Sequence, residues 1–194
     1  MCIRDRYKVE VRINPTDKTL TFIDNGIGMT EDEVDEYINQ IAFSGAAAFM
    51  EQYKDKASDE QIIGHFGLGF YSAFMVADKV TIDTLSYKEG ATPVHWECDG
   101  GTEFDMEDGD KAERGTTITL YLNDESYEFC NEYRCREVLN KYCSFMPVEI
   151  YFVNEEEEAK KAEEAAKKDA EEKVIDVDVK DADAKENNAC LLYT

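Results

Sequence analysis

The sequence predicts an α+β two-layer sandwich, in which a mostly antiparallel sheet carries helices on one face. Three observations support this prediction. Several segments alternate apolar and polar residues, two others repeat apolar residues at helical spacing, and turn residues separate most of them. Helices that interrupt a mainly antiparallel series of strands generally pack against one face of the sheet.

A hairpin opens this fold. Residues 7–13 (YKVEVRI) alternate strictly between apolar and charged side chains, which is typical of a half-buried strand. The segment NPTDK supplies turn residues, and 19–24 (TLTFID) is the predicted returning strand.

Two helical segments follow the hairpin. Thr30 and Glu33 have the spacing of a capping box, and apolar residues then recur every three or four positions, so we predict a helix over 31–42. We expect the next stretch to be mobile with one short helix at most, and we predict a second helix over 71–76.

From residue 78 the apolar period returns to two. The strand candidates are 79–85, 93–98, 102–106 and 116–122, and the turns between them predict an antiparallel meander. Residues 131–145 form a predicted helix, and 148–153 a last apolar strand. We expect this helix to turn five side chains toward the core, namely Tyr133, Val138, Leu139, Tyr142 and Phe145.

Charge and composition exclude several classes of protein. The formal net charge of −23 argues against direct nucleic-acid binding, which needs a basic surface, and favours basic partners. The sequence has six cysteines without a CxxC pair and only two histidines, so it offers few suitable ligands for a zinc site. We therefore expect free thiols in a reducing compartment. No apolar run approaches the roughly 18 residues of a membrane span, and no signal peptide is recognisable. These features predict a cytoplasmic protein without a membrane partner.

The two ends of the chain differ from the rest. Residues 154–194 hold 14 acidic and 7 basic side chains with few large apolar ones, so we expect a solvated acidic helix or linker rather than core. Residues 1–6 (MCIRDR) and the last five (CLLYT) continue none of the strand, helix or charge patterns described above, and we expect them to be non-native. The domain itself is therefore predicted over 7–153.

The segment 64–74 (GHFGLGFYSAF) combines three glycines with a following helix. Backbone N–H groups at such a turn can cradle a phosphate, since no side chain blocks the approach and the helix dipole attracts an anion. The spacing G-x-x-G-x-G reverses the dinucleotide-binding motif, however, and no P-loop is present. A plain tight turn remains the alternative.

Two further segments suggest how a nucleotide base could be held. In DNGIGM, Asp24 could accept a hydrogen bond from an exocyclic amine such as adenine N6, Gly26 and Gly28 would let a flat base lie against the backbone, and Met29 would form a soft wall. In RGTTITL, Thr116 could support the base edge through its hydroxyl or a water molecule. Taken alone, the first is equally an Asp-Asn-Gly turn, and the second is a common way to open a strand.

Together these segments resemble the ATP site of the GHKL (Bergerat-type) ATPases, which include gyrase, MutL, histidine kinases and a chaperone family. The runs DNGIGMT, IAFSGAAAFM, IGHFGLGFYSAFMVADKV and RGTTITLYL specifically resemble the 90-kDa heat-shock chaperone family in its bacterial form. The resemblance covers roughly residues 7–153.

The resemblance implies roles for individual residues. Asp24 would bind the adenine amine with support from Thr116, and residues 30–63 would form a nucleotide lid. The other cofactor-binding positions that it implies for ATP or ADP are Gly26, Gly28, Met29 and Ile38 on the base side, Ser44 and Gly45 in the lid, and Gly67, Gly69 and Phe70 in the phosphate loop. It also implies client unfolded proteins as partners and a homodimer formed through a C-terminal domain.

Two departures from the family pattern bear on catalysis. Phe43 stands where many members have a lysine before the lid's Ser-Gly. The family's catalytic glutamate and magnesium-binding asparagine lie on an upstream helix as E-x-x-x-N, and EVRIN (10–14) matches those letters only within a predicted strand. We therefore expect a domain truncated at both ends, with no catalytic or metal-binding residue in this chain.

Three functions stay open. The first is the ATP-binding domain of an ATP-driven folding chaperone, and the second is the ATPase domain of a histidine kinase or topoisomerase. The third is a non-enzymatic acidic interaction module, which a nucleotide titration would separate from the other two.

Overall fold

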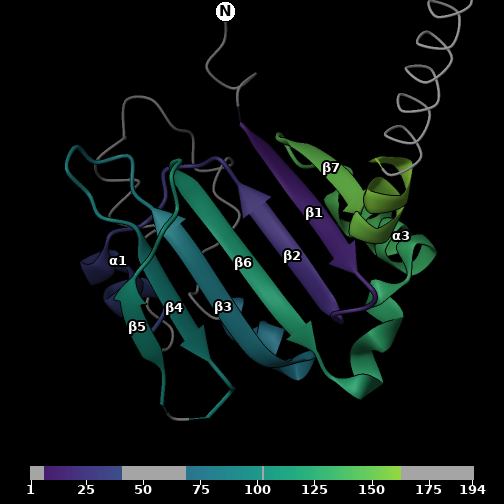
Figure 1. Cartoon of the computed structure of the whole chain (residues 1–194), viewed down its shortest axis with the longest axis horizontal. Coiled ribbons are helices and arrows are strands. Elements are labelled where there is room, and N and C mark those ends of the chain that lie inside the picture. The colour runs from purple at the N-terminus through teal and green to yellow at the C-terminus, as the bar shows by residue number, and fades with distance from the viewer. Residues whose placement is uncertain (1–6, 41–68, 102, 163–194) are drawn as a thin grey trace, which may run out of the picture. The chain divides into compact units, whose positions relative to one another are not determined.

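A single seven-stranded sheet organises the computed structural model, which describes residues 7–40, 69–101 and 103–162 (Figure 1). The strand order is β5-β4-β3-β6-β2-β1-β7. The strands are β1 (Lys8–Asn14), β2 (Thr19–Asp24), β3 (Ala77–Leu85), β4 (Val94–Cys98), β5 (Asp105–Asp108), β6 (Gly115–Leu122) and β7 (Glu149–Asn154). All neighbours are antiparallel except β1 and β7, which are parallel, so the mostly antiparallel sheet is confirmed.

The predicted hairpin forms as expected. Strands β1 and β2 pair antiparallel from Val9 opposite Asp24 to Asn14 opposite Thr19. The turn between them is closed by Asn14 and Asp17, because the Asn14 amide donates to the Asp17 carboxylate and the Asp17 N–H donates back to Asn14 Oδ1. This register places Asp24 at the end of β2, where the chain leaves the sheet.

Strand β6 corrects the predicted meander. Strands β3, β4 and β5 do follow one another, but β6 lies between β3 and β2 instead of beside β5, as Figure 1 shows. The sequence of β6 accounts for this position, since Leu120 and Leu122 are buried on one face and the strand pairs along its length with both neighbours. A central strand of this kind has two paired edges, and turn residues alone do not reveal which strands supply them.

The helix after the hairpin begins as predicted and is shorter. Thr30 caps α1 (Glu31–Tyr37), and both bonds of the capping box to Glu33 are present. Residues 38–40 form a turn, and 41–42 lie outside the described part of the chain. The helix predicted over 71–76 is a 3₁₀ helix, η3 (Phe70–Met75).

The predicted orientation of the late helix is wrong for three side chains. Helix α3 (Glu132–Cys143) follows the 3₁₀ helix η4 (Asp124–Cys130), and its buried residue is Cys135. Tyr133, Tyr142 and Phe145 are exposed, while Leu139 packs against the core and Val138 is half-buried. The buried stripe of the helix is therefore narrower than its apolar spacing suggested.

The core lies on one face of the sheet, as a two-layer sandwich requires. Alternate residues of the strands, such as Ile13, Val80 and Ile82, form one apolar cluster with Val34 of α1 and Cys135 of α3. Burial of such side chains is the main force that holds helices to a sheet.

A separate compact unit begins at Glu155. Its described part, residues 155–162, is helical and largely exposed, and ion pairs join Glu156 to Lys160 and Glu157 to Lys161. The charge pattern thus forms the i,i+4 pairs expected of a solvated helix. No helix in the described ranges is long and apolar enough to cross a membrane.

Deleting residues 155–194 is expected to leave the sheet unit intact, since exposed ion pairs of this type contribute only about 0.3–0.5 kcal/mol each. Calorimetry in physiological salt should show a shift in Tm of less than about 2 °C. The control deletion removes 149–194 and with it β7, and it should lower Tm strongly. A drop of several degrees in the shorter deletion would mean that the acidic segment packs on the sheet unit.

Candidate functional site

The carboxylate of Asp24 is held at the end of β2 by two backbone N–H groups. Gly26 N donates to Asp24 Oδ1 over 2.7 Å, and Thr116 N donates to the same oxygen over 3.3 Å. Asp24 is half-buried. Because both bonds use Oδ1, they fix the orientation of the carboxylate. No other part of the described chain bonds its second oxygen, Oδ2, which can accept from a ligand.

The loop after Asp24 crosses the end of β3 at a distance that only glycine permits. Gly28 has a φ of +63°, and a Cβ placed on it would lie 1.9 Å from the carbonyl oxygen of Leu85. The crossing is fixed by the Tyr87 N–H, which donates to the Ile27 carbonyl over 2.7 Å. Gly28 is thus required by backbone packing, a reason separate from the base contact that the sequence suggested.

The beginning of β6 approaches β2 just as closely. Gly115 has a φ of +124°, and its Cβ would lie 2.1 Å from the Asp24 carbonyl oxygen. The next residue, Thr116, is buried and supplies the N–H that binds the Asp24 carboxylate. Its hydroxyl contacts Thr84 Oγ1 at 3.1 Å, so the side chain faces the interior of the sheet.

Thr84 is the site residue that sequence reasoning missed. Its hydroxyl accepts from Met29 N over 2.9 Å, lies 3.1 Å from Thr116 Oγ1, and donates toward the Gly115 carbonyl at 3.3 Å. The available signal was a hydroxyl at a core-facing position of an alternating strand, where Val80 and Ile82 precede it. A buried hydroxyl needs partners, and here the partners are the two segments that carry the predicted base site.

The remaining predicted residues take different places. Met29 is half-buried and packs against the core, and Ile38 is buried with its carbonyl accepting from the Tyr71 hydroxyl. The ring of Phe70 packs edge-on against Trp96 with centroids 5.7 Å apart. A Cβ added to Gly69 would have no described atom within 4 Å, so packing among these residues does not require glycine there. Ser44, Gly45, Gly67 and Phe43 lie outside the described residues.

An ion pair ties α1 to the loop after β3. Lys88 Nζ lies 2.9 Å from Glu33 Oε1, and Glu33 also closes the capping box with Thr30. Partial burial raises the pKa of Glu33, but its bonds to Lys88 and Thr30 outweigh this effect and hold the pKa below the usual value. Glu33 therefore stays ionised and anchors the start of the helix.

Another charged cluster lies on the sheet face away from the core. His95 Nδ1 contacts Asp83 Oδ1 at 2.6 Å, and Glu97 pairs with Lys79. The hydrogen bond to Asp83 raises the pKa of His95 above its usual value. Among the described residues no group of three or more His, Cys, Asp or Glu is arranged to hold a metal ion.

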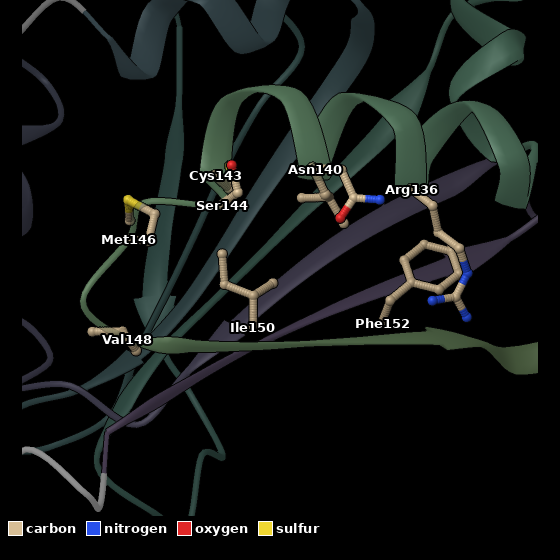
Figure 2. Close-up of a pocket in the computed structure, with 9 residues that line it drawn as sticks. Arg136, Asn140, Cys143, Ser144, Met146, Val148, Ile150 and Phe152 are labelled. Carbon is tan, nitrogen blue, oxygen red and sulfur yellow. The ribbon is translucent and has the colours of Figure 1, made fainter.

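A groove of about 310 Å³ lies between α3 and β7 (Figure 2). Figure 2 shows Ile150 and Phe152 on the strand facing Asn140 and Arg136 on the helix. The Arg136 guanidinium lies over the Phe152 ring, 4.4 Å from its centroid, and also binds Glu132. None of the residues that line this groove is among the predicted site residues.

The chain is similar to one protein family and to several named relatives. Residues 5–103 match a family described as histidine kinase-, DNA gyrase B-, and HSP90-like ATPase. The chain is 58% identical over 139 residues to the chaperone protein htpG of Bacteroides fragilis, a match that covers 72% of the chain and 20% of that relative. It is 49% identical over 150 residues to the HtpG of Porphyromonas gingivalis, covering 77% of the chain and 22% of the relative. For the HtpG of Cronobacter sakazakii the identity is 48% over 147 residues, with 74% and 24% covered. The chain thus spans about a fifth to a quarter of the length of these relatives.

Gly28→Ala is expected to destabilise the domain by at least about 2 kcal/mol, because a left-handed backbone conformation and a clash with the Leu85 carbonyl act together. Gly69→Ala is the matched control: Gly69 has ordinary helical angles, so its substitution should leave the free energy of unfolding nearly unchanged. Urea unfolding of both variants measures the difference. Equal stability of the two would show that the loop can move away from β3 at little cost.

Proposed function

The chain belongs to the histidine kinase-, DNA gyrase B- and HSP90-like ATPase family, and on that premise we propose that residues 7–153 form the ATP-binding domain of a protein-folding chaperone. The observation that carries the proposal is the Asp24 carboxylate, which two backbone N–H groups hold in one orientation at the end of β2. Relatives that are 48–58% identical and named as HtpG chaperones support the chaperone assignment.

The donor and acceptor pattern of this site fits adenine. With Oδ1 engaged by Gly26 and Thr116, Oδ2 is an acceptor that suits the exocyclic N6 amine of the base. Guanine carries an acceptor, O6, at the equivalent position and would meet the carboxylate with like partial charges. We therefore assign adenine recognition to Asp24, with Thr116 as its backbone support.

The phosphate side of the nucleotide is assigned to the glycine segment that ends at Gly69. Support comes from the open space at Gly69, where a side chain would meet no described atom, and from the start of η3 directly after it. Gly67 and the lid residues Ser44 and Gly45 enter this proposal through the family resemblance alone. Gly28, Met29 and Ile38 are assigned to the base side, where Gly28 and Met29 belong to the loop that Asp24 begins.

For the whole protein we propose a cytoplasmic, stress-response chaperone that works as a homodimeric clamp. ATP, with Mg²⁺ in the intact protein, would order the lid, and hydrolysis would reset the clamp on unfolded client proteins. The support is the name shared by the relatives and the family resemblance, and we assign dimerisation to a C-terminal domain. Neither nucleic acid nor a membrane enters this proposal as a partner.

Asp24→Asn is expected to weaken binding of ADP at least about tenfold, since a charge-assisted hydrogen bond contributes roughly 1.5–3 kcal/mol. The substitution keeps an oxygen for the two N–H donors and replaces Oδ2 with an amide that faces the adenine amine donor to donor. Isothermal calorimetry, or an NMR titration where affinity is low, measures the loss.

Asp99→Asn is the matched control for this variant. Asp99 Oδ1 accepts from Gly101 N over 3.0 Å, which repeats the Asp24–Gly26 turn away from the site. The affinity of the Asp99→Asn variant for ADP should equal that of the unaltered chain. If Asp24→Asn folds and also keeps full affinity, Asp24 does not bind the base.

We also propose that a polypeptide of these 194 residues binds ATP weakly at best and does not hydrolyse it. Hydrolysis needs a general base and a metal ion, and the family resemblance assigns both to an upstream helix. The matching letters EVRIN form strand β1, where Glu10 binds Arg12 and Asn14 closes the hairpin turn. Phosphate release with excess Mg²⁺ should stay at the level of the buffer. Steady turnover that Asp24→Asn abolishes would place the catalytic residues within this chain.

A further inference from the structure

Thr84 is a fully buried polar residue among the apolar side chains of β3. Its exposed fraction is 0%, equal to that of Val80 and Ile82 on the same face of the strand. A hydroxyl in such surroundings is unfavourable unless its hydrogen bonds are made. Thr84 makes them with Met29, Thr116 and Gly115, none of which is close to it in sequence.

Two of these partners, Met29 and Thr116, belong to the segments whose N–H groups hold the Asp24 carboxylate. Met29 ends the loop in which Gly26 N donates to Asp24 Oδ1, and Thr116 provides the second N–H to that oxygen. The Thr84 hydroxyl therefore links the loop after β2 to the beginning of β6. No direct contact between Thr84 and Asp24 is needed for one to orient the other.

The hydroxyls of Thr84 and Thr116 can satisfy each other and the neighbouring backbone within this cluster. Thr84 Oγ1 receives the Met29 N–H and can donate to the Gly115 carbonyl, while one proton lies between the two hydroxyl oxygens. Replacing Thr84 with valine keeps the shape and removes every one of these bonds. The Met29 N–H would then lose its acceptor, and the buried Thr116 hydroxyl would lose its partner.

From this arrangement we propose that Thr84 is a positioning residue, which fixes the Asp24 carboxylate and thereby sets the selectivity of the site for adenine over guanine. The proposal rests on the proposed function of nucleotide binding. A carboxylate fixed in one orientation presents Oδ2 to an amine and repels the guanine O6. A carboxylate on a loosened loop can turn away, so discrimination between the bases falls even where contacts to the phosphates remain.

The experiment compares Thr84→Val, Thr84→Ser and Thr81→Val in the 194-residue chain. ADP and GDP are titrated against each by NMR, and the ratio of their dissociation constants is the readout. Thr81 is the matched control because it is buried on the same strand but faces the other side of the sheet. Loss of stability alone lowers both affinities together and leaves the ratio unchanged.

Thr84→Val should weaken ADP binding about tenfold, which corresponds to about 1.4 kcal/mol, and should lower the preference for ADP over GDP by a similar factor. Thr84→Ser keeps the hydroxyl and should stay within about twofold of the unaltered chain, as should Thr81→Val. An unchanged ratio in folded Thr84→Val, or a loss in Thr84→Ser as large as that in Thr84→Val, would overturn the proposal.

Amide hydrogen exchange gives a second readout that needs no ligand. The N–H groups of Met29 and Thr116 should exchange faster in Thr84→Val, while those of Val80 and Ile82 keep their protection. Unchanged exchange at Met29 and Thr116 would overturn the positioning role. If Thr84→Val does not fold, Thr84→Cys takes its place, since a thiol is a weak hydrogen-bonding group of similar size.

The two proposals fail in different ways. A chain whose spectrum does not respond to either nucleotide even at the highest concentration of the titration overturns the assignment of nucleotide binding to these residues, and the exchange rates still decide whether Thr84 holds the loop. A chain that binds ADP with an ADP preference that Thr84→Val leaves intact overturns the present inference alone.

Discussion

The contact between the end of β2 and the beginning of β6 is the constraint on which the candidate site depends. At this point the backbones lie so close that a Cβ on Gly115 would stand 2.1 Å from the Asp24 carbonyl oxygen. The contact exists because β6 enters the sheet between β2 and β3, and it brings the Thr116 N–H to the Asp24 carboxylate. The crossing at Gly28 and the hydroxyl of Thr84 secure the same region from the side of β3. Three strands that are distant in sequence therefore share one rigid corner, and the carboxylate proposed to bind the base projects from it.

Much of this fold could be predicted from the residues, because its strands and α1 carry local signals. The alternation in 7–13 and 19–24 predicted β1 and β2 to within a residue, and Thr30 with Glu33 predicted the start of α1. Strand order is not a local property. The alternation of side chains in 116–122 is the same whether β6 lies beside β5 or between β3 and β2. The predicted meander was therefore wrong in the position of that strand. The side chains of α3 that were expected in the core show the same limit, since helical spacing does not tell how wide a stripe the sheet covers.

In the candidate site, Asp24 and the nearby glycines could be proposed from the sequence, and the residues that support them could not. Asp24 and the glycines near it stand in motifs, and the motif letters drew attention to them. Thr84 stands in no motif, and its partners Met29 and Thr116 are brought to it only by the folded sheet. The glycines also illustrate a second point: Gly28 and Gly115 satisfy backbone contacts within the protein, while Gly69 meets no described atom. Glycines that look alike in the motifs can therefore have different roles: some permit close backbone contacts within the protein, and others can leave space for a ligand.

The parallel pairing of β1 with β7 affects how the domain can be made. Lys8 lies opposite Glu149, so the outer edge of β1 stays unpaired until β7, which follows α3 in the chain, has been synthesised. Until then Val11 and Ile13, which end buried, belong to a strand whose outer edge is unpaired. Open strand edges promote association between chains, and non-local pairing of this kind slows folding. The nascent domain is therefore most vulnerable to aggregation during the interval between synthesis of β2 and synthesis of β7, and conditions that slow translation after residue 122 would lengthen that interval.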